Sequence, residues 1–147
     1  MKLSTKGRYA MRAMLDLAQH YGEGLILLKD VARRQDISER YLEHLFLTLK
    51  AAGLVTSARG ARGGFVLSHA PSEIKLLNII RACEGDLAPV ECVSDPSTCN
   101  RASRCSARDV WCDLKEALES VLEKKSLQDM VEEQAKKEST ANHMYVI

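Results

Sequence analysis

Residues 37–68 read ISERYLEHLFLTLKAAGLVTSARGARGGFVLS, a predicted helix that passes directly into a β-hairpin. Ser38 is a good N-terminal cap, because its hydroxyl can accept a hydrogen bond from a backbone amide of the first turn. Apolar residues then follow along one face: Leu42, Leu45, Phe46 and Leu49. This spacing predicts an amphipathic helix, and Gly53 is a typical C-terminal stop.

The hairpin consists of two predicted strands, residues 54–57 and 65–68, joined by an unusual tip. The tip has the sequence ARGARGG, in which the glycines allow tight turns and Arg59 and Arg62 supply positive charge. It is longer and more basic than a minimal hairpin turn requires. This tip is therefore a candidate contact with a polyanion.

Two further helices are predicted upstream. The first covers residues 5–21 and stops at the GEG sequence of residues 22–24. A short apolar run then leads into a brief helix whose basic side chains are expected to face outward: Lys29, Arg33 and Arg34. A turn at residues 36–37 separates it from the helix that begins after Ser38, which is a helix-turn-helix pattern. A hairpin placed directly after a helix-turn-helix is the wing of a winged helix.

The second half is predicted to be helical apart from one cysteine-rich loop. A helix capped at Ser72 precedes the loop, and a long helix over residues 106–125 follows it. The long helix carries an apolar stripe: Trp111, Leu114, Leu118, Val121 and Leu122. Ser126 is expected to cap a last short helix that ends near residue 136. The fold class is therefore mainly α with a small β-hairpin wing.

The composition separates the two halves by charge. The 147 residues have a net charge of +1, but residues 1–72 hold 11 Lys/Arg against 6 Asp/Glu, and residues 73–147 hold 10 against 14. A basic half suits a nucleic acid partner. The sequence has neither a signal-peptide pattern nor an apolar run long enough for a membrane span. We therefore expect a cytoplasmic protein, in which cysteines stay reduced.

The helix after the turn is the expected recognition helix, because its N-terminal residues can reach base edges in a major groove. Polar residues gather at that end: Ser38, Glu39, Arg40, Glu43 and His44. Arginine can bind guanine with two hydrogen bonds, and glutamate can accept one from cytosine. Arg59 and Arg62 would enter a minor groove or bind phosphates. The alternatives are a merely solvated helix face and a winged helix that binds protein.

Three of the five cysteines, Cys92, Cys99 and Cys105, share the loop at intervals that do not match the close pairs of a structural zinc site. Wider spacing suits a larger group such as an iron–sulfur cluster, which would also order a loop that cannot pack on itself. A thiol redox switch, zinc and inert cysteines are the alternatives. Cys83 lies on an apolar helix face and is expected to be a small buried hydrophobe. Cys112 is ambiguous, because it lies off the apolar stripe.

The sequence resembles the IscR-type winged-helix regulators, a family that includes iron–sulfur, nitric-oxide and iron sensors. The resemblance rests on MKLSTKGRYAMRAMLDLA at the start, ISERYLEHLFLTLKAAGLV in the helix-turn-helix, SARGARGGFVL in the wing, and the three loop cysteines. It implies a homodimer held by the helix 106–125 and a palindromic double-stranded operator. It also implies a cluster held by Cys92, Cys99 and Cys105 plus a variable fourth ligand. The implied DNA-binding residues are Ser38, Arg40, Tyr41, Glu43 and, in the wing, Arg59.

The chain departs from both fourth-ligand patterns of the family. Arg108 stands where the 2Fe–2S members have a ligating histidine, and Arg8 stands where the nitric-oxide sensors have an aspartate. The candidates are then Cys112, Asp109, Glu91, or an exogenous thiol or water. A 2Fe–2S cluster is slightly favoured over 4Fe–4S.

These inferences divide the chain into four predicted regions. They are the winged helix-turn-helix (1–84), the cluster-binding loop (85–105), the dimerisation helix with a short C-terminal helix (106–136) and a flexible tail (137–147). The favoured hypothesis is a homodimeric transcription regulator whose operator affinity is modulated by the cluster. The alternative is a thiol–disulfide redox-sensing regulator without a cluster. No catalytic motif, and so no small-molecule substrate, is predicted; repressor and activator both stay open.

Overall fold

The computed structural model describes residues 2–58 and 64–144 of the chain. Its larger elements are, in chain order, α1 (Thr5–Gln19), β1 (Ile26–Leu27), α2 (Leu28–Gln35), α3 (Glu39–Ala51), β2 (Val55–Ser57), β3 (Gly64–Leu67), α4 (Leu76–Glu84), α5 (Glu91–Ser94), α6 (Ser106–Lys124) and α7 (Leu127–Met144). Three short 3₁₀ turns complete the list: η1 (Pro71–Glu73), η2 (Pro96–Thr98) and η3 (Ala102–Arg104). The mainly helical fold with a small hairpin wing is confirmed.

The helix-turn-helix follows from local backbone preferences. α2 ends at Asp36, which adopts a left-handed conformation with φ 53°; aspartate tolerates this better than most residues. Ser38 then caps α3, and its side chain accepts a hydrogen bond from the amide of Tyr41 at 3.1 Å. The turn and the cap were both predicted from the sequence.

The wing belongs to a sheet of three antiparallel strands in the order β1–β3–β2. β2 and β3 pair as the predicted hairpin, with Thr56 opposite Val66. β1 adds a third strand, in which Ile26 lies opposite Phe65. The sequence showed only a short apolar run there, because two residues are too few to show strand periodicity.

One hydrophobic core joins α1, α2, α3, α4, the sheet and the start of α7. Its largest fully buried side chains include Phe46, Met14, Leu17 and Leu42. The apolar stripe predicted for residues 42–49 is completely buried, so the pattern located the packed face of α3 correctly. This core holds α3 rigidly with its opposite face outward.

The predicted cap of α4 at Ser72 is wrong. Pro71–Glu73 forms a 3₁₀ turn instead, and α4 begins at Leu76. The intervening backbone is extended because it pairs with the junction of α6 and α7: the amide of Leu76 donates to Lys125 O at 3.0 Å, and the amide of Leu127 to Ile74 O at 2.8 Å. This long-range pairing has no local sequence signal.

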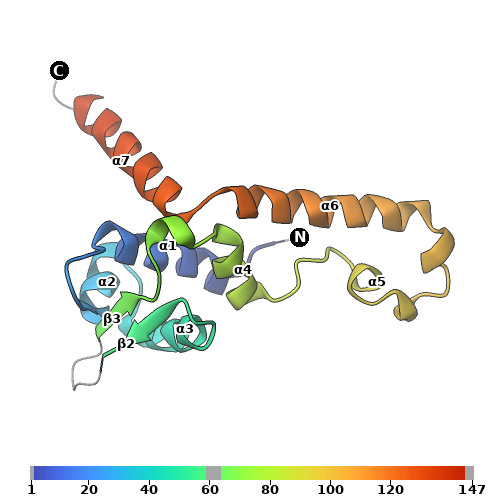
Figure 1. Ribbon diagram of the computed structural model, residues 1–147, viewed down its shortest axis with the longest axis horizontal. Helices are drawn as coiled ribbons and strands as arrows, with labels where there is room; N and C mark the ends of the chain where they lie inside the picture. The colour runs from blue at the N-terminus through green and yellow to red at the C-terminus, as the bar shows by residue number, and fades with distance from the viewer. Residues whose placement is uncertain (1, 59–63, 145–147) are drawn as a thin grey trace.

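α6 projects from the body as a long arm, with the cysteine segment folded beside its outer end (Figure 1). α7 leaves the same junction in another direction and packs its first turns on the body. Ser126 caps α7 as predicted by accepting from the Asp129 amide, and the Asp129 carboxylate accepts from the Ser126 amide at 2.8 Å. The predicted end near residue 136 is wrong, since α7 continues to Met144. Side-chain bonds such as Gln134–Glu138 support this exposed helix without an apolar stripe.

Candidate nucleic-acid interface and cysteine segment

The outer face of α3 carries the side chains that were predicted to contact DNA. Ser38, Arg40, Glu43 and His44 are all exposed. Ser38 and Glu39 stand at the N-terminus of the helix, and Leu47 continues the same face with 64 % of its surface exposed. Within residues 2–58 and 64–144, this face of α3 is thus left exposed. The contacts of these residues with bases stay predictions.

Tyr41 lies toward the packed side of α3. Its ring meets the ring of Tyr9 edge-on, with centroids 5.4 Å apart, so α1 directly supports the start of α3. Burial raises the pKa of Tyr41, which keeps its hydroxyl protonated. A protonated hydroxyl beside an exposed helix face can donate to a phosphate.

Basic side chains of α1 extend the same region, and sequence reasoning did not include them. The guanidinium of Arg12 lies over the Tyr9 ring, 5.4 Å from its centroid, and also donates to the backbone oxygen of Gln35 in α2. Arg8, one turn earlier, donates to Thr5 Oγ1 at 3.1 Å. The run KGRYAMR was the available signal, because it places arginines at helical spacing on either side of Tyr9.

Arg59 and Arg62, predicted at the wing tip, lie outside the described residues. The base of the wing is well anchored: Lys50 Nζ at the end of α3 donates to Ser57 Oγ at 2.6 Å, and the hydroxyls of Thr56 and Ser68 are 2.9 Å apart across the strands. The wing therefore starts from a fixed position relative to α3.

A buried carboxylate fixes α2 against α1. Asp16 is 1 % exposed and receives two hydrogen bonds from Arg34, at 2.9 and 2.7 Å, and one from Gln35 at 3.1 Å. The bond to Asp16 raises the pKa of Arg34. The prediction that Arg34 simply faces outward is therefore incomplete. A polar residue within the apolar stripe of residues 10–18 was the sequence signal for such a pair.

The cysteine segment contains short helical turns instead of an irregular loop. Cys92 lies in α5, Cys99 follows η2, and Cys105 directly precedes α6. Asp95 shapes η2 by accepting from the amide and the hydroxyl of Ser97, at 3.0 and 2.6 Å. The local Asp-Pro-Ser sequence thus builds its own turn.

Polar contacts hold this segment against α6. Arg108 Nε donates to the backbone oxygen of Cys92 at 3.0 Å, which places α5 beside the first turn of α6. Lys115 Nζ lies 3.1 Å from Asp86. Hydrogen bonds from Ser94, Lys115 and the Ala88 amide lower the pKa of Asp86 to about 2. The first half of the segment is therefore attached to α6 at two points, Asp86 and Cys92.

All five cysteines are free thiols; Cys99 is exposed and the other four are half-buried. Within residues 2–58 and 64–144, no three His, Cys, Asp or Glu side chains lie close enough together to hold a metal ion. Cys92, Cys99 and Cys105 have the donor chemistry for an iron–sulfur cluster and share one segment, but in the described fold their side chains lie too far apart to hold one. Cys83 packs against the core, where burial raises the pKa of its thiol, but it is half-buried and so less enclosed than predicted.

Among the described helices, none combines the length and apolar character that crossing a membrane needs.

The candidates for a fourth ligand lie at separate places along the segment and α6. Arg108 donates a hydrogen bond to Cys92, whereas Cys112 lies half-buried in α6 and Asp109 lies in the first turn of α6. Glu91 opens α5. The structure does not bring any of these candidates together with the three cysteines.

Residues 3–133 match the sequence profile of the Rrf2 family, described as iron-dependent transcriptional regulators. The chain is 42 % identical over 130 residues to the HTH-type transcriptional regulator CymR of Bacillus subtilis. The aligned region covers 88 % of this chain and 89 % of CymR. The solved structure of that protein, the global cysteine regulator of B. subtilis, superposes with a TM-score of 0.74 over 90 % of this chain and 97 % of that chain, at 41 % identity. The structure of T. potens IscR gives a TM-score of 0.73 at 42 % identity, covering 91 % of this chain and 88 % of that chain.

Proposed function

Because this chain belongs to the Rrf2 family and is a DNA-binding transcriptional regulator, we propose that an iron–sulfur cluster held by Cys92, Cys99 and Cys105 modulates its affinity for operator DNA. The observation that carries the proposal is the position of these thiols. All three are free and sit on one segment that is attached to α6. Similarity to T. potens IscR supports the same proposal.

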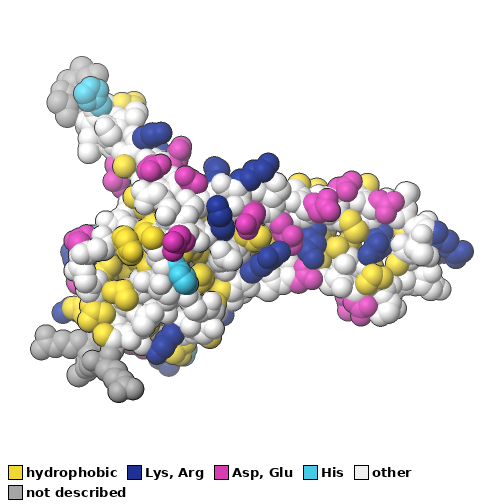
Figure 2. Space-filling model, in the orientation of Figure 1, with side chains coloured by type: hydrophobic (Ala, Val, Ile, Leu, Met, Phe, Trp, Pro, Cys, Tyr) yellow, Lys and Arg dark blue, Asp and Glu magenta, His cyan; other side chains and the backbone are white. Residues whose placement is uncertain are grey.

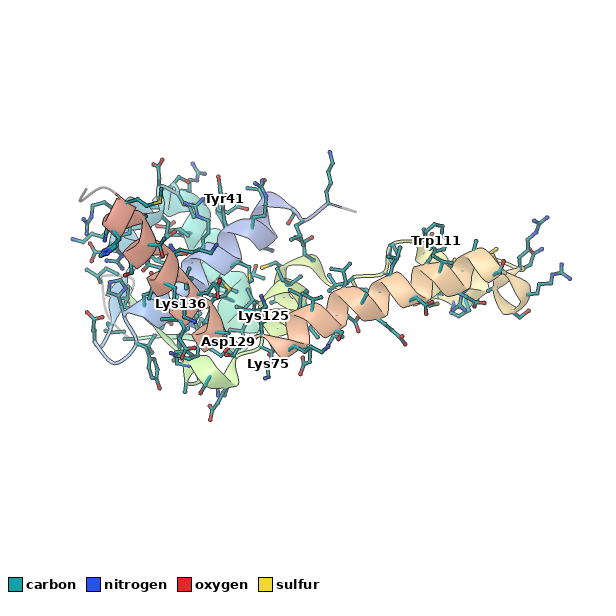
Figure 3. The ribbon with its side chains drawn as sticks, turned by 90° about the horizontal axis from the view of Figure 1, so that it is seen from above. Tyr41, Lys75, Trp111, Lys125, Asp129 and Lys136 are labelled. Atoms are coloured by element: carbon teal, nitrogen blue, oxygen red, sulfur yellow. The ribbon has the colours of Figure 1, made fainter. Side chains whose placement is uncertain are left out.

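The chain acts as a homodimer in this proposal, with α6 as the contact. No residue of α6, all of which the structure describes, is buried within the single chain. Its exposed apolar side chains include Val121 (60 %), Val110 (52 %), Trp111 (37 %) and Leu118 (37 %). Figure 3 places Trp111 far out on the arm, and Figure 2 shows hydrophobic atoms exposed among the charges along it. An uncovered apolar face of this kind is typical of an interface, and two arms would present two recognition helices to a palindrome.

Each part of the chain then has a defined role. α3 presents Ser38, Arg40, Glu43 and His44 to base edges, and Tyr41 and the wing arginines Arg59 and Arg62 bind the phosphate backbone. The three thiolates bind the cluster, which supplies a redox- and iron-sensitive group that only an intact segment can hold. Cys112 is the leading candidate for the fourth ligand, and the cluster is 2Fe–2S or 4Fe–4S. Gathering the thiols requires the segment to rearrange beside α6, and this is the change that DNA binding would sense.

An anaerobic purification tests the cluster. We expect broad visible absorption and equal amounts of iron and acid-labile sulfide, with the number per chain deciding between 2Fe–2S and 4Fe–4S. Cys99→Ser should lose the iron, whereas Cys83→Ser, a matched change outside the segment, should keep it. A colourless protein that takes up no iron on reconstitution would contradict the proposal.

A thiol–disulfide switch is the second candidate, and one observation favours it. The thiols of the segment are free and not gathered around a common point, and Cys99 is exposed to oxidants. Similarity to a cysteine regulator points the same way. Mass spectrometry after mild oxidation would then find a disulfide among Cys92, Cys99, Cys105 and Cys112. Operator affinity would change with that disulfide and not with iron.

A further inference from the structure

Glu84 stands at the point where the cysteine segment leaves the body. It is the last residue of α4, and the next residue, Gly85, has a φ of +73°, which side chains rarely tolerate. Everything from Gly85 to α6 follows this turn. The side chain of Glu84, however, contacts Ser4, near the N-terminal end of the sequence.

The carboxylate of Glu84 holds the N-terminus of α1. Its Oε1 accepts from the backbone amide of Ser4 at 2.9 Å and from Ser4 Oγ at 2.5 Å. Ser4 Oγ in turn accepts from the amide of Gly7 at 3.1 Å, so Ser4 is both the cap of α1 and the partner of Glu84. A negative charge at this end of a helix is also favoured by the helix dipole.

The Glu84 carboxylate occupies the space that a side chain at position 7 would need, and Gly7 has no side chain to fill it. A Cβ at position 7 would lie 2.4 Å from Glu84 Oε1, closer than any real contact allows. Within a helix, glycine costs about 0.5–1 kcal/mol relative to alanine. Gly7, the buried residue of the first turn of α1, is thus a poor helix former at a position where alanine would displace the Glu84 carboxylate.

The two neighbours of Gly85 are attached to different parts of the molecule. Glu84 binds the start of α1, whereas Asp86 binds Lys115 on α6 at 3.1 Å. Two residues beyond Gly7, Tyr9 packs on Tyr41 of the recognition helix. A continuous line of contacts therefore runs from the cysteine segment through Glu84 and α1 to α3.

We propose that Glu84 is a positioning residue that transmits the state of the cysteine segment to the recognition helix, through Ser4 and the first turn of α1. The proposal rests on the proposed function, in which the segment modulates operator affinity. In Glu84→Ala the two hydrogen bonds between Ser4 and the Glu84 carboxylate, which we call the tie, are lost. In Gly7→Ala the added Cβ must displace the Glu84 carboxylate, so we expect its bonds to Ser4 to be lost while Glu84 is still present and helix propensity improves. In Glu84→Gln the amide oxygen can still accept both bonds from Ser4, so the tie is kept.

The experiment uses full-length protein, loaded with iron and sulfide or stripped of them, and a duplex selected from a random library by the loaded wild type. The first readout is the ratio of operator Kd values in the two states. The second is amide hydrogen exchange at residues 4–8 and 85–90. Glu73→Gln, an exposed carboxylate before α4, is the control.

We expect Glu84→Ala and Gly7→Ala to keep the wild-type iron content but to bring the Kd ratio to unity. We also expect faster exchange at residues 4–8 and at 85–90 together. Glu84→Gln and Glu73→Gln should retain the wild-type ratio. A wild-type ratio in both Glu84→Ala and Gly7→Ala, or faster exchange confined to residues 4–8, would overturn the proposal. If wild type itself binds the operator equally in both states, the proposed function fails, and coupled exchange at the two segments still shows whether the tie exists.

Discussion

At the scale of single residues, the most informative side chain is a buried carboxylate on a largely apolar helix. Asp16 lies within the apolar stripe of α1 and is buried beneath Arg34 and Gln35. A buried carboxylate without its partners would be very unfavourable. We therefore expect the bidentate pair to fix the position of α2, and so of the turn before α3, against α1.

Asp16→Asn should lower the free energy of unfolding by about 2–3 kcal/mol, because it leaves the guanidinium of Arg34 without its charge partner in a half-buried place. Asp30→Asn is a matched control, since Asp30 pairs with Arg33 at 3.6 Å on the surface. That change should cost less than about 0.5 kcal/mol. Urea unfolding of both variants at one protein concentration measures the difference. Equal effects would show that burial of Asp16 contributes nothing.

Arg40 belongs to the exposed face of α3, so Arg40→Ala should leave stability unchanged and weaken operator binding by about 1–3 kcal/mol with relaxed preference at one base pair. Lys136→Ala removes the same charge from α7, on another part of the surface (Figure 3). Fluorescence titration with the selected operator and with single-base variants is the measurement. If Lys136→Ala lowered operator affinity as much as Arg40→Ala, Arg40 would contribute only through general electrostatics.

Asp86 makes the attachment of the segment dependent on pH. Its pKa is lowered to about 2 from an ordinary 3.8, so its contribution to stability is complete well above pH 3.8 and is lost as the pH falls through 2. Asp86→Asn should therefore destabilise the protein at pH 7, and the difference in free energy of unfolding between wild type and variant, here called the gap, should shrink toward pH 3. Chemical unfolding at several pH values measures this gap. A gap that is constant with pH would exclude the ionised form of Asp86 as its source.

At the scale of elements, the local patterns predicted the structure wherever neighbours in sequence decide it. The cap at Ser38, the buried stripe of α3 and the extent of α6 all follow from side chains within a few turns of one another. The failures are long-range. α4 starts late because Ile74 and Leu76 pair with the chain around Ser126, and β1 exists only because β3 is beside it.

The candidate site divides in the same way. Helical spacing alone identified the exposed face of α3. The roles of Tyr9 and Arg12 depend on the packing of α1 against α2 and α3, which no local pattern encodes. Cysteine spacing identified the segment, but the distances between the thiols depend on how η2 and η3 fold and could not be inferred from it.

α6 should be the dimer contact, because its apolar face is uncovered in the single chain. Val121→Asp would place a charge in that contact and should shift the protein from dimer to monomer in analytical ultracentrifugation. The control Leu47→Asp puts the same charge on an exposed leucine of α3, which is 64 % exposed, and should not change sedimentation. A dimer that survives Val121→Asp would move the interface away from α6.

At the scale of the whole molecule, the winged-helix body and the arm formed by α6 are joined at one junction, where residues 74–76 pair with residues 125–127. The body end of α6 is held by the backbone pairs around Lys125 and by Arg81, which lies 3.2 Å from Glu119. In Figure 3, Lys75, Lys125 and Asp129 mark this junction. A rearrangement beside the outer half of α6 therefore has two routes to the body: the helix itself and the turn at Gly85.

The central claim is that the state of the cysteine segment sets operator affinity. Its most direct test is a titration of one operator duplex with the same preparation, first loaded with iron and sulfide and then stripped, at fixed salt. We expect the two forms to differ in Kd by about five- to 150-fold, the usual range of an allosteric coupling. The variant with Cys92, Cys99 and Cys105 all replaced by serine should bind like the stripped form. Equal affinities for loaded and stripped wild type would contradict the account.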